Sequence, residues 1–109
     1  IARFGGLDGA RLRALVEEGF ANPQTNQNAS PSIGEFLAML TEHPELRVGG
    51  YSVPQSRPDY RVSLDSVWLD DLDAVPAARR DAVVALFEQL EGTATNVDPE
   101  GAAHRCWWT

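Results

Sequence analysis

The chain has 109 residues, of which 43% are hydrophobic and 23% are charged, and its formal net charge is −7. This length and balance predict one compact domain that folds on an apolar core, and the single cysteine excludes a framework of internal disulfides. The acidic balance disfavours binding to nucleic-acid backbones and to anionic membrane surfaces, and no apolar run reaches the ~20 residues that span a bilayer.

The first predicted element is a helix over Asp8–Phe20. Apolar residues recur there at three- and four-residue spacing, and charged residues occupy the other faces. Asp8 is a suitable N-cap, because its side chain can accept a hydrogen bond from a free backbone N–H. Pro23 restricts the residue before it and so ends the helical region. The polar segment Ala21–Ser30 is then predicted to be a surface loop.

The second predicted helix has a clearer start. Ser32 and Glu35 have the spacing of a capping box, in which each side chain can bond the backbone N–H of the other residue. An apolar stripe follows at helical spacing, and Pro44 ends it. The sequence therefore predicts a helix over Ile33–His43.

Two strands are predicted next, because the hydrophobic period changes to two. They span Leu46–Val53 and Tyr60–Leu69, and the turn-rich segment Pro54–Asp59 between them favours a hairpin with a longer loop. Gly49 and Gly50 interrupt the first strand. We interpret this pair as a β-bulge or a close backbone approach; a tight turn is the alternative.

A third helix and a last strand complete the predicted fold. The helix begins at Pro76, carries an apolar stripe to Leu90 and has Gly92 as its C-terminal cap. A polar tail, Thr93–Gly101, precedes a short apolar strand over Ala103–Trp108. The element order α-α-β-β-α-β predicts a two-layer α+β domain with a small, mainly antiparallel, three-stranded sheet packed on helices.

The nearest approach to a catalytic cluster is His104 with Cys106. In a strand these residues share a face, about 6.6 Å apart along the chain at a rise near 3.3 Å per residue. A cysteine nucleophile needs a nearby base, but cysteine is also among the most buried residue types. We interpret the pair as structural. The alternative is a small enzyme or ligand-binding protein with a site near His104, between the sheet and a loop, completed by Tyr51 or Tyr60.

The acidic run Asp70, Asp71 and Asp73 offers oxygen ligands, but it lacks the ligand ladder and terminal Glu of a calcium-binding loop. It precedes the third predicted helix, whose N-terminus favours negative charge. The run is therefore interpreted as a helix start that also presents an acidic surface. The histidines and the cysteine lack the paired spacing of zinc sites, and we expect no metal site.

Motifs for nucleotide chemistry and for serine hydrolysis are absent from the sequence. The pairs Gly5–Gly6 and Gly49–Gly50 stand in no Walker or dinucleotide pattern, and the chain has no Lys. The Gly-x-Ser-x-Gly motif does not occur. We therefore expect no cofactor.

Three tryptophans are the most individual feature of the sequence. Trp107 and Trp108 are adjacent, so in a strand they face opposite sides of the sheet. Each of them, like Trp68, could lie either in the core or on the surface. An exposed indole on a sheet is a suitable anchor for a partner, whereas a buried one belongs to the core. Trp68, Trp107 and Trp108, with the three aspartates, are the candidate interaction residues.

These observations favour a non-enzymatic protein-interaction module that binds a protein partner or a second copy of itself. The acidic balance favours fast association with a basic partner. All nine cationic residues are Arg, which suggests a GC-rich bacterial genome, and the chain starts at Ile1 rather than Met. We expect a soluble, cytoplasmic domain over residues 1–109 that is trimmed or excised from a longer chain.

Overall fold

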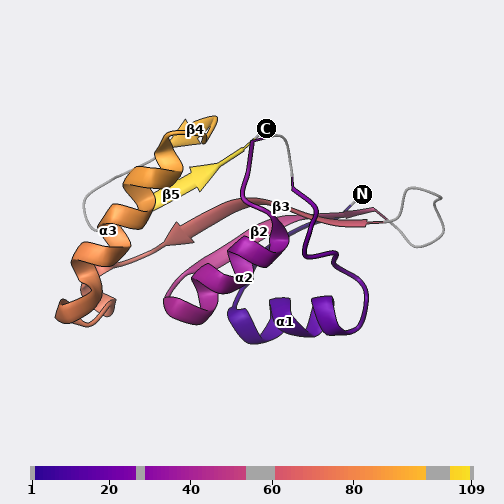
Figure 1. Cartoon of the computed structure of the whole chain (residues 1–109), viewed down its shortest axis with the longest axis horizontal. Coiled ribbons are helices and arrows are strands. Elements are labelled where there is room, and N and C mark those ends of the chain that lie inside the picture. The colour runs from indigo at the N-terminus through magenta and orange to yellow at the C-terminus, as the bar shows by residue number, and fades with distance from the viewer. Residues whose placement is uncertain (1, 27–28, 54–60, 98–103, 109) are drawn as a thin grey trace.

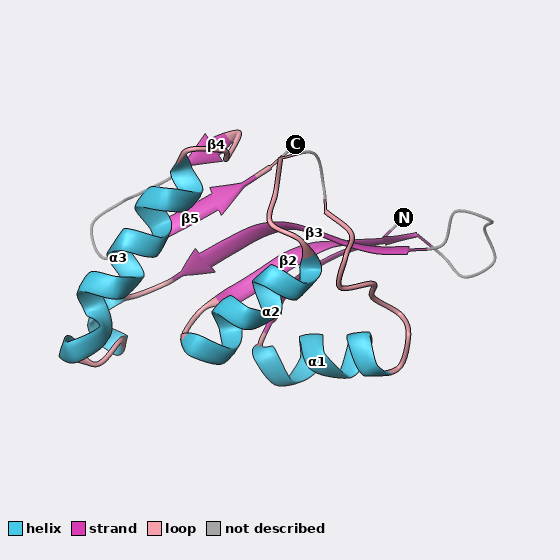
Figure 2. Cartoon of the chain, in the orientation of Figure 1, coloured by secondary structure: helices cyan, strands magenta, loops and turns pink. Residues whose placement is uncertain are grey.

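A computed structural model describes residues 2–26, 29–53, 61–97 and 104–108 of the chain. In chain order the elements are β1 (Ala2–Leu7), α1 (Gly9–Glu17), α2 (Ile33–Glu42), β2 (Arg47–Val53), β3 (Arg61–Leu69), the 3-10 helix η1 (Leu72–Ala74), α3 (Ala77–Glu91), β4 (Asn96–Val97) and β5 (His104–Trp107). The strands form one antiparallel sheet in the order β1-β2-β3-β5-β4, and the helices α1, α2 and α3 lie on one face of it (Figures 1 and 2). The predicted α+β class is confirmed.

The predicted order and strand number need correction. An N-terminal strand, β1, precedes the first helix and pairs with β2, and the two-residue β4 adds a short edge beside β5. The prediction missed β1 because Gly5 and Gly6 break any alternation of apolar and polar residues. The ladder is irregular between Phe4 and Leu7, and Gly6 has a φ of 73° that a glycine adopts without strain.

Helix α1 is shorter than the predicted Asp8–Phe20. Asp8 caps it as expected, because its side chain accepts the N–H of Arg11 at 2.9 Å. The helix ends at Glu17 because Gly19 has a φ of 83°, and the N–H of Phe20 turns back to the carbonyl of Leu15 at 2.9 Å. This is a left-handed glycine stop with the two backbone bonds of a Schellman motif.

Helices α2 and α3 agree with the predicted elements. The capping box of α2 is confirmed: Glu35 N–H donates to Ser32 Oγ at 3.1 Å, and Ser32 N–H donates to Glu35 Oε1 at 3.0 Å. His43 is the C-cap of α2. Pro76 is the N-cap of α3 and Gly92 is its C-cap.

A β-bulge in β3 controls which side chains of this strand face the helices. Gly49 of β2 pairs with Ser66, and Gly50 pairs with Leu64, so Asp65 is one extra residue on β3. The predicted irregularity at the two glycines is confirmed. The core side of β3 therefore changes from even-numbered to odd-numbered positions at the bulge. The buried apolar residues of β3 are Val62, Leu64, Val67 and Leu69.

A polar junction connects the end of α2 with the first turn of α3. Arg79 of α3 donates to Nδ1 of the buried His43 at 3.2 Å and to Oε2 of Glu45 at 2.6 Å. The hydrogen bond from Arg79 lowers the pKa of Glu45. These charge-assisted bonds give the junction a structural role.

Parts of several predicted elements lie outside the described residues. They are Gln27 and Asn28 of the predicted loop, the connector Pro54–Asp59, Tyr60 at the start of the second strand, Asp98–Gly101 of the polar tail and Ala103 of the last strand.

The register at the bulge predicts that Gly50 cannot be replaced by a residue with a side chain without loss of stability. A Cβ added there would overlap the carbonyl of Ser63, which cannot move without breaking the ladder. Gly50→Ala should therefore lower the free energy of unfolding by about 3 kcal/mol. Gly6→Ala is the control, because the Cβ added there would have no atom within 4 Å. Its only cost is the left-handed backbone conformation of an alanine, about 1 kcal/mol. Denaturant unfolding measures both, and equal losses would contradict the bulge register.

Candidate functional site

His104 and Cys106 share the face of β5 that packs against the helices. They pair with Leu69 and Val67 of β3, which are core residues. The ring of His104 lies against Phe87 of α3, with 5.2 Å between ring centroids. Cys106 is fully buried. The predicted common face is observed, but no hydrogen bond joins the two side chains among the residues that the structure describes.

Burial, together with the charge of Glu91, raises the pKa of the Cys106 thiol to about 11. A nucleophilic cysteine requires the opposite shift, because the thiolate is the reactive form. At neutral pH the thiol therefore stays protonated and packs as a small apolar group.

The three candidate aspartates lie in and before η1 at the end of β3. Asp71 caps η1, because its carboxylate accepts the N–H of Asp73 at 2.9 Å. The carbonyl of Asp73 accepts a hydrogen bond from Arg80 at 3.1 Å. Asp70, Asp71 and Asp73 are all exposed. Asp71 therefore begins the 3-10 helix and not α3, whose N-cap is Pro76 and whose first turn contains no acidic residue, so the predicted role of the run at the start of the third helix is wrong. Within the described ranges no three His, Cys, Asp or Glu residues are grouped as metal ligands.

The adjacent tryptophans separate onto opposite sides of the sheet, as their spacing predicts. Trp108 is 1% exposed and packs edge-on against Phe36 of α2, with 5.8 Å between ring centroids. Its backbone N–H donates to the carbonyl of Asp65 at 2.8 Å, and its indole N–H donates to Thr93 at 3.2 Å. Trp108 is therefore a core residue and not an interaction residue, because its indole is not available to a partner.

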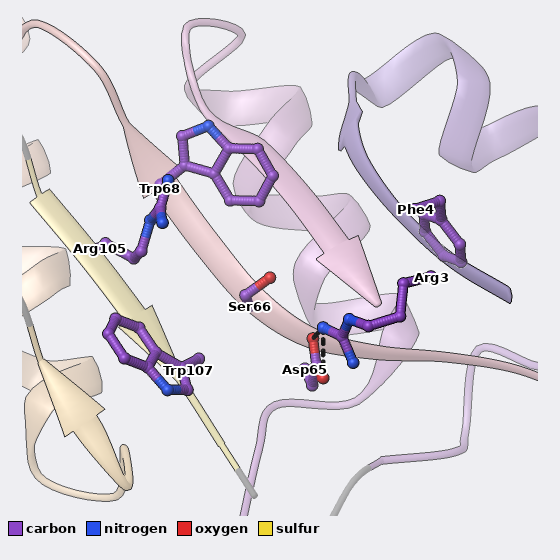
Figure 3. Close-up of a pocket in the computed structure, with 7 residues that line it drawn as sticks. All are labelled: Arg3, Phe4, Asp65, Ser66, Trp68, Arg105 and Trp107. Carbon is purple, nitrogen blue, oxygen red and sulfur yellow. Dashed lines mark hydrogen bonds and ion pairs between the residues drawn. The ribbon is translucent and has the colours of Figure 1, made fainter. Parts of the chain in front are cut away.

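Trp107 takes the surface position, on the face that α1, α2 and α3 leave open. It pairs with Ser66 of β3, two residues along the ladder from the pair Trp68–Arg105, so the two pairs face the same side. Trp68 and Trp107 are both half-buried. Figure 3 looks onto this face, with the ribbon of the helices behind the sheet and both indoles in front of it. We call this side of the sheet the outer face.

The outer face contains a hollow of about 310 Å³. Strands β1, β3 and β5 supply its walls, so segments from both ends of the chain meet there. The residues that line it are Arg3, Phe4, Asp65, Ser66, Trp68, Arg105 and Trp107.

Two glycines make room for the indole of Trp68. A Cβ on Gly5 would lie 3.2 Å from Cη2 of this ring, and a Cβ on Gly49 would lie 3.1 Å from its Cζ3. Both distances are tighter than ordinary van der Waals contact. The indole therefore extends across β2 towards β1 over positions without side chains.

Two arginines and one aspartate supply the charge of the hollow. Arg105 lies over the Trp68 ring, with 5.3 Å from Cζ to the ring centroid, a cation–π arrangement. Arg3 donates from Nη2 to both carboxylate oxygens of Asp65, at 3.0 and 3.2 Å. The Asp65 carboxylate is thus neutralised by Arg3, whereas no carboxylate of the described chain pairs with Arg105.

The hollow on the outer face does not include the alternative site predicted near His104. His104 faces the helices, whereas Tyr51 pairs across β-ladders with Arg3 and Ser63. Tyr60 lies outside the described residues. Among the described residues, His104 lines neither the hollow of the outer face nor the hollows that lie along the helices at Arg13, Met39 and Glu35.

Sequence reasoning missed four polar residues of the hollow: Arg3, Asp65, Ser66 and Arg105. Arg105 had a usable signal, because it lies two positions before Trp107 in one strand and so shares its face. The strand that holds Arg3 was not predicted. Ser66 could not be placed because the bulge at Asp65 changes the face of every residue after it.

Comparison of the chain with models of known protein families, with curated proteins and with solved structures finds no match. Within the described residues, no helix is long and apolar enough to cross a membrane.

The raised pKa of Cys106 predicts a loss of stability at high pH. The folded state holds its thiol proton up to about pH 11, whereas the unfolded thiol releases it near pH 9. This contribution is complete below pH 9 and is lost as the pH rises through 11, by up to about 1.4 kcal/mol per pH unit. Denaturant unfolding of wild type and Cys106→Ala should give a difference that shrinks across this window. A difference that stays constant from pH 8 to 11 would contradict the burial of the thiol.

Proposed function

We propose that this chain is a protein-interaction module that binds a segment of another polypeptide on its outer face. The observation that supports this most strongly is the presence of Trp68 and Trp107, both half-buried, in the lining of one hollow on the face that the three α-helices leave open. A one-sided antiparallel sheet normally presents polar residues to water. Indoles at such a position are the side chains that most often carry binding energy at interfaces.

The architecture also supports a rigid binding face. Trp107 lies between Cys106, which is in the core, and Trp108, which is bonded to Asp65 and Thr93. The indole of Trp68 packs on the backbone of Gly5 and Gly49, where a side chain would leave too little room for it. Side chains that are ordered before binding lose less entropy when a partner arrives.

Catalysis at the alternative site has weaker support. The thiol of Cys106 is protonated at neutral pH, and His104 is packed against Phe87 on the helical side. A polypeptide is a better occupant of the outer face than a small molecule, because the hollow opens onto a sheet surface rather than into the interior.

Selection from a displayed library of random linear peptides tests this function. We expect wild type to enrich peptides whose affinity falls at least about tenfold on Trp107→Ala, because a central indole carries much of the binding energy of an interface. Leu86→Ala on α3 is the matched control, since it removes a half-buried apolar side chain from the helical side. Fluorescence anisotropy with labelled peptides measures each dissociation constant.

Two results would contradict the proposed function. One is enrichment no greater than that on the Trp68→Ala/Trp107→Ala double variant, provided that circular dichroism shows this variant folded. The other is a concentration-dependent dimer of the chain alone, seen by sedimentation velocity and abolished by Trp107→Ala. That dimer would make a second copy the occupant of the outer face.

A further inference from the structure

We propose that the outer face recognises a carboxylate side chain, an Asp or Glu of the bound segment, held between Arg105 and Ser66. This inference rests on the proposed function and adds the chemistry of the partner. It starts from two successive outward-facing pairs of the β3–β5 ladder, Ser66 with Trp107 and Trp68 with Arg105, which the inward-facing pair Val67–Cys106 separates. Figure 3 shows these four side chains on one side of the sheet.

The two polar residues of this set are diagonal neighbours. On one face of an antiparallel ladder, directly opposed Cβ atoms lie about 5 Å apart and diagonal positions about 7–8 Å apart. At this spacing of the two positions, the hydroxyl of Ser66 and the longer side chain of Arg105 can both reach one carboxylate placed over the diagonal. The two indoles occupy the other diagonal, so the acidic group would be flanked by apolar surface on both sides.

Both donors are available. Ser66 Oγ and the Arg105 guanidinium have no hydrogen-bond or ion-pair partner among the residues that the structure describes. The guanidinium lies over the ring of Trp68, 5.3 Å from its centroid. A guanidinium that stacks on a ring keeps its in-plane N–H groups free for a carboxylate, and the stacking limits the entropy lost on binding.

The charged residues that line the hollow leave one positive charge unpaired, which suits a ligand group with a single negative charge. It contains Arg3, Asp65 and Arg105, and Arg3 is already bonded to Asp65, so Arg105 is the one cation of its lining that no described carboxylate neutralises. Elsewhere the chain is strongly acidic, with a net charge of −7. A polyanion would be repelled by that charge, whereas one carboxylate placed at Arg105 is attracted locally.

This proposal differs from the expectation that the binding partner is basic. The expectation came from the overall charge of the chain, which describes long-range attraction. The residue that would contact the partner on the outer face is cationic. Asp71 and Asp73, by contrast, already take part in the hydrogen bonds around η1.

A double-mutant cycle tests the carboxylate contact. A peptide whose binding depends on Trp107 is synthesised with its acidic residue and with the isosteric amide, Glu→Gln or Asp→Asn. We expect the amide peptide to bind wild type at least about tenfold more weakly, because charge-assisted hydrogen bonds are lost. On Arg105→Gln the difference between the two peptides should shrink to a few-fold or less, because only the Ser66 hydroxyl still contacts the carboxylate. Arg11→Gln, an exposed arginine of α1, is the control and should leave the full difference in place.

The two proposals fail in distinguishable ways. If the peptides depend on Trp107 but share no acidic residue, or if the acidic and amide peptides differ equally on wild type and Arg105→Gln, the carboxylate inference is overturned and the interaction module remains. If no enriched peptide depends on Trp107, both are overturned. Thermal unfolding of Arg105→Gln close to that of wild type shows that the variant is folded, as its exposed position leads us to expect.

Discussion

The extra residue at Asp65 is the constraint on which both faces of the sheet depend. It shifts the alternation of β3 by one position, so that Leu64 before it and Val67 after it both reach the core. Strict alternation from Leu64 would bring Trp68 to the helical side. With the bulge, Trp68 lies on the outer face opposite Arg105. One inserted residue therefore converts a second core tryptophan into a surface residue.

The bulge also ties three distant segments together. The carbonyl of Asp65 accepts the N–H of Trp108 near the end of the chain, and its carboxylate accepts a hydrogen bond from Arg3 near the start. Gly50 lets β2 approach β3 where the register changes. The buried hydrogen bond at the carbonyl contributes to stability, while the exposed ion pair contributes little. The arrangement of the outer face is thus set mainly by backbone geometry.

The sequence predicted local structure well and long-range structure poorly, and the reason is physical. The caps at Asp8 and Ser32 depend on neighbours within four residues, so they could be read directly. β1 could not, because its strand conformation comes from pairing with β2, and Gly5 accommodates the indole of Trp68, 63 positions later. Gly19 was a missed local signal: it lay inside the predicted helix Asp8–Phe20, although its left-handed φ ends α1.

The candidate site, too, has one part that the sequence could predict and one part that it could not. The opposite orientations of Trp107 and Trp108 follow from the period of a strand and were predictable. The side that each would face was not, because it depends on where the helices pack. Once Trp108 is fixed in the core by Phe36 and by the Asp65 carbonyl, Trp107 must project from the outer face, and Arg105 with it. A substitution that preserves the outer residues but releases Trp108 would therefore be expected to disturb binding, because the same short strand serves the core and the outer face.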